Sequence, residues 1–178
     1  MKSRVQANKK EYPLLRSLNA LYSILLAGLI VVLIFTVWFS SVRISDGGMA
    51  PVFQEGDVIL FDKLAKHLSM PERGDAYAFR LNEGTSVGRI VALPGDRVQL
   101  YEGRVYVNGY LLDESRYARE CAWEMDEVTL PEGCFFLMPD ERTAQYPDFE
   151  SMVIPFEALI GRAALRVAPF GMINVFVA

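Results

Sequence analysis

The sequence predicts a mainly β protein, in which a single N-terminal transmembrane helix precedes one β domain that folds as a partly open barrel or a sandwich. Two observations carry this prediction. One uncharged apolar run of twenty residues lies near the N-terminus, and beyond it short apolar runs alternate with turn residues and few stretches show a helical period. The 178 residues suffice for one domain and an anchor but not for two ordinary domains.

The apolar run from Ala20 to Phe39 predicts the transmembrane helix. At 1.5 Å per residue it spans about 30 Å, the thickness of a bilayer core. A cleaved signal peptide has a shorter apolar region, about 7–15 residues, and a small-x-small site, whereas this run ends in Trp38-Phe39. Residues 1–17 carry a net charge of +4, which the positive-inside rule places in the cytoplasm. We therefore expect a cytoplasmic arm over 1–17, a permanent helix over 18–41 in the cell membrane, and an extracytoplasmic β domain over 42–178.

Short apolar runs bounded by turn residues predict the strands of the β domain. Glu102-Gly103 separates two of these runs and predicts a hairpin. Residues 64–70 fit either a short helix or a loop, and residues 113–132 are charged and irregular and receive no assignment. The expected strands are 58–61, 75–80, 86–93, 97–101, 104–107, 110–112, 134–138 and 159–167.

Charge and cysteine content limit the partners. Residues 40–178 carry a net charge of −8, which argues against nucleic acid because phosphate binding needs a basic face. We expect no cofactor and no metal ion. Cys121 and Cys134 have twelve residues between them. An extracytoplasmic location permits a disulfide, and two separate thiols remain an equal alternative.

Two motifs resemble the signatures of the type I signal peptidase family, the membrane-bound Ser/Lys proteases that remove secretory signal peptides. They are Ser45-Asp46-Gly47-Gly48-Met49-Ala50-Pro51 and Val87-Gly88-Arg89-Ile90-Val91-Ala92-Leu93-Pro94-Gly95-Asp96. In that family the residue before the Met is the nucleophilic serine, and a lysine in the second motif is the base. Here the two positions fall on Gly48 and Gly88. Four further pieces resemble the family in the same order, at 56–60, 105–109, 139–142 and 160–163.

Two more departures accompany the loss of the dyad. Asp46 stands where the family has a serine whose hydroxyl helps to hold the oxyanion in some members. Residues 143–149 replace the family pattern that contains a lysine-orienting serine. Glycine can neither attack an amide nor accept a proton, and a carboxylate opposes the negative charge that builds up in acyl transfer. Together these changes predict that the Ser/Lys mechanism is absent.

The resemblance implies a signal-peptidase-type β domain with an extended peptide-binding cleft. The chain is similar to the small streptococcal members that have lost the dyad and are encoded with pilus subunits. That similarity implies a membrane protein of a Gram-positive bacterium that acts as a chaperone-like accessory in pilus assembly. Its partners would be a segment of a secreted or pilin-like protein and, as a further candidate, sortase. The expected cleft residues are Asp46, Gly47, Gly48, Met49, Ala50, Ser86 and Gly88.

The two missing side chains predict free room at the floor of this cleft. The short reach from Phe39 to Gly48 predicts that the cleft lies close to the outer leaflet. Met49, Val52 and Phe53 would then lie near the lipid, and ordinary core packing is the alternative for these three residues.

Two other functions stay open. The chain could be an active signal peptidase with an unorthodox nucleophile, for which Ser86 is the best hydroxyl. Ser86 lacks an evident partner. A Ser/Lys pair outside the membrane would have to use Lys63 or Lys66, His67 is the sole histidine, and Asp46 could form a carboxylate pair with Asp96 or Asp140. Alternatively, the chain could bind an authentic signal peptidase as a partner subunit.

Overall fold

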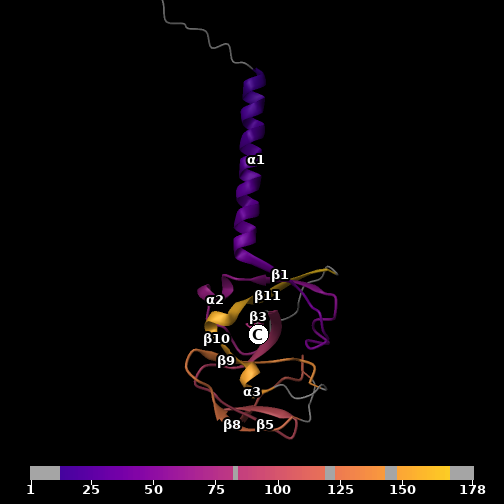
Figure 1. Ribbon diagram of the computed structural model, residues 1–178, viewed down its shortest axis with the longest axis vertical. Coiled ribbons are helices and arrows are strands. Elements are labelled where there is room, and N and C mark those ends of the chain that lie inside the picture. The colour runs from indigo at the N-terminus through magenta and orange to yellow at the C-terminus, as the bar shows by residue number, and fades with distance from the viewer. Residues whose placement is uncertain (1–12, 82–83, 119–122, 143–147, 169–178) are drawn as a thin grey trace, which may run out of the picture. The chain divides into compact units, whose positions relative to one another are not determined.

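The computed structural model describes residues 13–81, 84–118, 123–142 and 148–168 (Figure 1). The chain divides into an N-terminal helical unit, which ends at Val37, and a β unit from Trp38 onward. The helical unit contains α1 (Pro13–Trp38), which begins with a proline, a residue whose missing N–H costs nothing in the first turn.

The stretch Arg16–Trp38 of α1 is long and apolar enough to cross a membrane. Its polar side chains are satisfied by the helix itself: Ser23 Oγ donates to the Asn19 carbonyl at 2.9 Å, and Thr36 Oγ1 donates to the Leu33 carbonyl at 2.8 Å. Such local bonds suit an apolar solvent, in which every polar group needs an internal partner. The helix can therefore serve as a membrane anchor.

Helix α1 ends at Trp38, whereas the sequence predicts that the transmembrane helix extends to residue 41. Residues 39–41 instead begin strand β1 (Phe39–Arg43), whose register pairs Phe39 with Asp62 and Ser41 with Leu60. Phe39, the last residue of the uncharged run, therefore belongs to the first strand. The side chains of Phe39 and Val42 suit a strand as well as a membrane segment.

The β unit consists of two antiparallel sheets, which confirms the predicted mainly β fold. The seven-stranded sheet has the order β1-β2-β11-β3-β4-β9-β10 and the four-stranded sheet the order β7-β6-β5-β8. Strands that follow β1 in the first sheet are β2 (Val58–Asp62), β3 (Ala76–Leu81), β4 (Gly84–Ala92), β9 (Cys134–Met138), β10 (Val153–Pro155) and β11 (Leu159–Ala168). Those of the second are β5 (Arg97–Tyr101), β6 (Arg104–Val107), β7 (Tyr110–Leu111) and β8 (Met125–Thr129).

Each predicted strand is present, and no end moves by more than two residues. The hairpin β5–β6 turns at Glu102 and Gly103, whose φ angles are +50° and +72°, so that glycine takes the position with the larger positive φ. Residues 64–70 contain the short helix α2 (Ala65–Leu68), and the unassigned stretch 113–132 contains β8. Helix α3 (Phe149–Met152) and a single 3₁₀ turn, η1 (Phe156–Ala158), complete the described elements.

Buried side chains fill the β unit on both faces of the large sheet. One cluster joins Met49 and Phe53, which are 2% and 0% exposed, to Ile59, Phe61 and Ala163. Met49 and Phe53 are therefore core residues, as the core-packing alternative expects, and their distance from the lipid stays a prediction. Val52 packs partly buried against the same cluster.

Candidate functional site

The loop that carries Gly48 connects β1 to β2 and is closed at its base. Ile44 N–H donates to the Asp57 carbonyl at 2.8 Å, and Gly56 N–H donates to the Ile44 carbonyl at 2.9 Å. Within the loop, Phe53 N–H donates to the Met49 carbonyl at 2.8 Å. Since Ile44, Met49 and Phe53 are buried in the core, the intervening residues 45–48 are held out at the surface.

The backbone N–H of Gly48 is already occupied by a carboxylate. Asp46 Oδ1 accepts a hydrogen bond from it at 2.9 Å, although the Asp46 side chain is otherwise exposed. A Cβ atom added to Gly48 would lie 3.1 Å from the same oxygen and 3.8 Å from Pro139 Cβ. Position 48 therefore has room for a small side chain, but its N–H faces an anion.

Gly88 is buried in β4, opposite Tyr77 of β3. A Cβ atom added there would lie 3.2 Å from Phe79 Cε1 and 3.3 Å from Leu137 Cβ, both closer than most real Cβ contacts. The position is a tight apolar site. The expectation that the missing side chain leaves free room is wrong at this glycine, because its neighbours have closed around it.

The end of β9 brings the two glycines together. An added Cβ at Gly88 would contact Leu137, and one at Gly48 would contact Pro139, two residues later. The amide of Glu141 then donates to the Gly48 carbonyl at 2.9 Å, which ties the loop to the segment after β9. Two positions forty residues apart in the sequence are thus fixed to one short stretch of chain.

A small hollow of about 30 Å³ lies between the start of the Gly48 loop and the first half of β4. Three of the expected cleft residues line it: Asp46, Met49 and Ser86. The other four, Gly47, Gly48, Ala50 and Gly88, do not. A volume of about 30 Å³ holds no more than a few water molecules, so this is a small groove.

Comparison with known proteins assigns the chain to a family. The family model described as "Signal peptidase, peptidase S26" matches residues 17–168. The chain belongs to the signal peptidase family S26. A relative from Synechocystis named "Probable signal peptidase I-2" is 30% identical over 175 residues, which cover 93% of this chain and 80% of the relative.

Two further relatives extend this result. "Signal peptidase I U" of Bacillus subtilis is 31% identical over 80% of this chain and 84% of its own. "Inactive signal peptidase IA" of Staphylococcus aureus is 25% identical over 84% of this chain and 91% of its own. The family thus includes a protein that is named inactive as well as proteins named as peptidases.

A buried ion pair lies beside both glycine positions. Arg89 Nε and Nη2 donate to the two Asp140 oxygens at 2.8 and 2.5 Å, and Arg89 Nη1 donates to the Gly74 carbonyl at 2.6 Å. The Tyr117 ring centroid lies 4.0 Å from Arg89 Cζ. Burial raises the pKa of Asp140, and the hydrogen bonds from Arg89 offset part of that rise. The sequence analysis names Arg89 only as part of a motif and Asp140 only in a motif and as a possible partner of Asp46. The one sequence signal for the Arg89–Asp140 pair is that Arg89 directly follows Gly88 and Asp140 directly follows Pro139.

A second bidentate ion pair holds the same segment of chain after β9. Arg142 donates from Nη1 and Nη2 to Glu114 at 2.7 and 2.6 Å, and from Nε to the Pro139 carbonyl at 2.9 Å. Arg89 therefore holds Asp140, and Arg142 holds the Pro139 carbonyl. These two buried arginines fix the segment 139–142 beside Gly48.

The replacement lysine and histidine candidates lie outside the hollow. Lys66 Nζ donates to the Leu159 carbonyl and sits 5.4 Å from the Phe156 ring, and burial lowers its pKa. His67 packs edge-on against the same ring, 6.2 Å between centroids. Lys63 is also absent from the residues that line the hollow.

The carboxylate candidates have structural partners. Asp96 is bonded by Arg73, by Asn108 Nδ2 and by the Leu93 N–H, and Asp140 is bonded by Arg89. Neither lines the hollow beside Asp46. Cys134 is half-buried, and Cys121 and residues 143–147 lie outside the described residues, so the disulfide and the replaced orienting pattern stay predictions.

Proposed function

We propose that this chain is a non-catalytic member of the signal peptidase family. The observation that carries the proposal is the hydrogen bond from the Gly48 N–H to Asp46 Oδ1, 2.9 Å long. Acyl transfer needs hydrogen-bond donors aimed at a developing oxyanion, and each such donor accounts for about 10²–10³ in rate. Here an amide at the reacting position is bonded to a carboxylate, which repels the negative charge that a donor should stabilise.

The side chains at the two reacting positions support the same conclusion. Gly48 has no atom that can attack, and Gly88 has none that can accept a proton. Phe79 and Leu137 close on Gly88, so the space that a buried lysine would need is taken by apolar groups.

We further propose that the groove binds an extended segment of another protein. Strand β4 pairs with β9 only from Arg89 onward, so residues 84–88 have no strand on that side in the described part of the chain. The exposed loop residues Ser45 and Asp46 lie across the hollow from Thr85 and Ser86. An added strand would gain main-chain hydrogen bonds there, and the shallow hollow would favour small side chains in it.

The partner we propose is a segment of a secreted, pilin-like protein, with sortase as a further partner and pilus assembly as the process. The chain would act outside the cell membrane, anchored by α1 with its N-terminus in the cytoplasm. The resemblance described above is the support for this role. Deleting the gene and blotting for high-molecular-weight pilin polymers tests it. Loss of the polymer ladder is expected, and an unchanged ladder would remove the proposal.

One observation favours a rival function, an active signal peptidase with a different nucleophile. Ser86 and Asp46 line the same hollow, which places a hydroxyl and a carboxylate at one groove. Incubating the purified full-length chain in detergent with a preprotein discriminates between the two functions. Cleavage that is lost in Ser86→Ala would support the rival, whereas no cleavage over a long incubation supports the non-catalytic function.

A further inference from the structure

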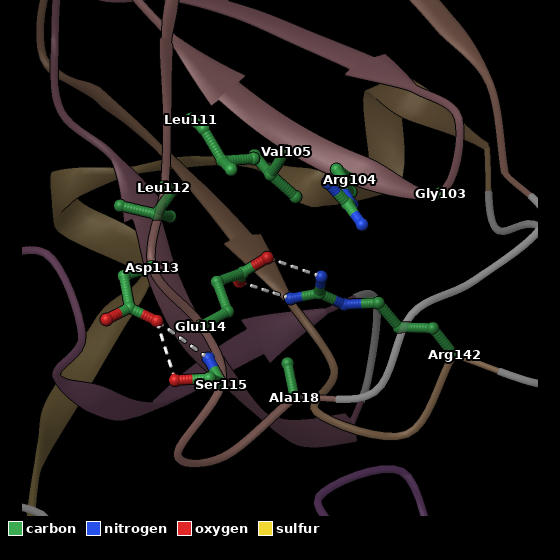
Figure 2. Close-up of a pocket in the computed structure, with 10 residues that line it drawn as sticks. All are labelled: Gly103, Arg104, Val105, Leu111, Leu112, Asp113, Glu114, Ser115, Ala118 and Arg142. Atoms are coloured by element: carbon green, nitrogen blue, oxygen red, sulfur yellow. Dashed lines mark hydrogen bonds and ion pairs between the residues drawn. The ribbon is translucent and has the colours of Figure 1, made fainter.

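A larger hollow, of about 290 Å³, lies beside the four-stranded sheet (Figure 2). Its walls come from β6, from β7 and the loop after it, and from Arg142. It shares no residue with the groove beside Asp46. Its volume falls just under the range for drug-sized ligands, so it fits one large side chain better than a whole small molecule.

The two sides of this hollow differ in chemistry. Figure 2 shows Val105, Leu111 and Leu112 along one side and Asp113 and Glu114 on the other. The lining holds two arginines and two carboxylates, so its charges balance. Asp113 Oδ1 accepts hydrogen bonds from the backbone N–H and the Oγ of Ser115. An occupant that complements this lining is uncharged, with an apolar body and a polar tip, which describes a tyrosine.

Strand β7 forms one wall and has an open edge. Leu111 is paired with Tyr106, and the next amide, that of Leu112, donates to the Val105 carbonyl at 2.9 Å. In an antiparallel ladder this makes Leu111 and Tyr106 a non-hydrogen-bonded pair, so the N–H and C=O of Leu111 point away from β6. No strand covers that side of β7 within the described ranges.

The exposed side chains on this edge match the hollow. Tyr110 is 79% exposed and Leu111 is 53% exposed, although both are large hydrophobic residues. We propose that a second copy of this chain pairs its β7 antiparallel with this β7, with Leu111 opposite Leu111 on a twofold axis. Tyr110 of the second copy then lies opposite Leu112 and enters the hollow.

This register makes the contact reciprocal. Because the interface is isologous, each copy inserts its Tyr110 and each receives one. The two Leu111 residues exchange both of their free main-chain hydrogen bonds. The hydroxyl of the inserted tyrosine can donate to Asp113. The strand has only two residues, so the dimer is a weak and reversible one, below the size of a standard stable interface. The proposal uses none of the residues that carry the proposed function.

Disulfide trapping tests the register directly. Directly opposite residues in a hydrogen-bonded pair have Cα atoms about 5.5 Å apart, which a disulfide can bridge. Leu111→Cys and, as a matched control, Tyr101→Cys are made in the full-length chain with Cys121 and Cys134 replaced by Ser. Tyr101 is in the same sheet and is 51% exposed, nearly as much as Leu111. Each purified variant in liposomes is oxidised with copper–phenanthroline and its linked dimer is measured.

We expect at least tenfold more linked dimer from Leu111→Cys than from Tyr101→Cys. Adding Tyr110→Ala to Leu111→Cys should reduce the linked dimer at least fivefold, and adding Tyr110→Phe should reduce it less. Equal linking at positions 101 and 111, or linking that does not respond to Tyr110→Ala, would overturn the proposal. Single-molecule photobleaching of the cysteine-free chain in a bilayer is a second measurement, and only monomers at every surface density would likewise overturn it.

Discussion

Gly48 and Gly88 lie against one short stretch of chain, Gly48 at Pro139 and Gly88 at Leu137 and Met138, but their other surroundings are of opposite kinds. Gly48 lies half-buried in a surface loop, and the nearest atom to an added Cβ is the end of an exposed side chain, Asp46 Oδ1. Gly88 lies buried in a central strand between Phe79 and Leu137. The difference teaches that the two positions changed in different ways. In the loop, the Asp46 carboxylate occupies the N–H of residue 48, and in the strand, apolar side chains enclose residue 88.

The largest expected effect concerns the support that both glycines share. Arg89→Met leaves the Asp140 carboxylate, 0% exposed, without its partner, and we expect a loss of about 3–5 kcal/mol in the free energy of unfolding. Chemical unfolding of the full-length chain in detergent, followed by circular dichroism, measures it. The double variant Arg89→Met with Asp140→Leu is the control and should recover most of the loss. If the single and double variants are equally stable, the pair does not hold this segment.

The second effect tests the charge on the loop side. Gly48→Ser with Gly88→Lys restores the two reacting groups, but Asp46 still occupies the amide of residue 48. We expect the triple variant with Asp46→Ser to cleave a preprotein about 10²–10³ times faster than this double variant, the effect of one oxyanion donor. Single-turnover cleavage with excess protein measures the ratio. Equal, measurable rates in the two variants would contradict the role given to Asp46, whereas no cleavage in either would show that Phe79 and Leu137 keep the lysine at position 88 out of place.

The third effect tests packing on the strand side with a matched pair. Gly88→Ala adds a methyl group between Phe79 and Leu137 and should destabilise the chain by about 1–3 kcal/mol. Gly48→Ala meets only the flexible Asp46 carboxylate and should change stability by less than about 0.5 kcal/mol. Neither glycine has a positive φ, so backbone strain does not enter. Equal losses at the two positions would erase the contrast between loop and strand.

The sequence predicts the strands whose apolar residues are continuous or bounded by clear turns, such as 134–138 and the hairpin at Glu102-Gly103. It misses β8 because only Met125 and Val128 of that strand are partly buried, and two of its three exposed residues are acidic. It assigns residues 39–41 to the membrane because an apolar run does not show where a helix stops and a strand begins. The local pattern of apolar residues does not show whether an apolar segment crosses a membrane or pairs with another strand.

The candidate site shows the same limit. The motifs place Asp46, Gly48 and Gly88 at the reacting positions before any geometry is known. They do not show that Asp46 turns back onto the Gly48 N–H, because a carboxylate two residues away can equally point into solvent. Nor do they show that Phe79 and Leu137 close on Gly88, because both come from other strands. Packing across strands decides the room at a site, and composition alone does not predict it.

The smallest effect concerns the turn after β4, which fixes the end of the strand that carries Gly88. Burial alone would raise the pKa of Asp96, but hydrogen bonds from Arg73, the Leu93 N–H and Asn108 lower it below its ordinary value. The stabilisation is therefore present above about pH 4 and is lost as the pH falls through the lowered pKa. We expect Asp96→Asn to cost about 1 kcal/mol at pH 6, since Arg73 is partly exposed, and less at pH 3. The melting temperatures of the unsubstituted protein and of Asp96→Asn at the two pH values measure this. A difference in melting temperature that stays constant with pH would show that the Asp96 charge does not hold the turn.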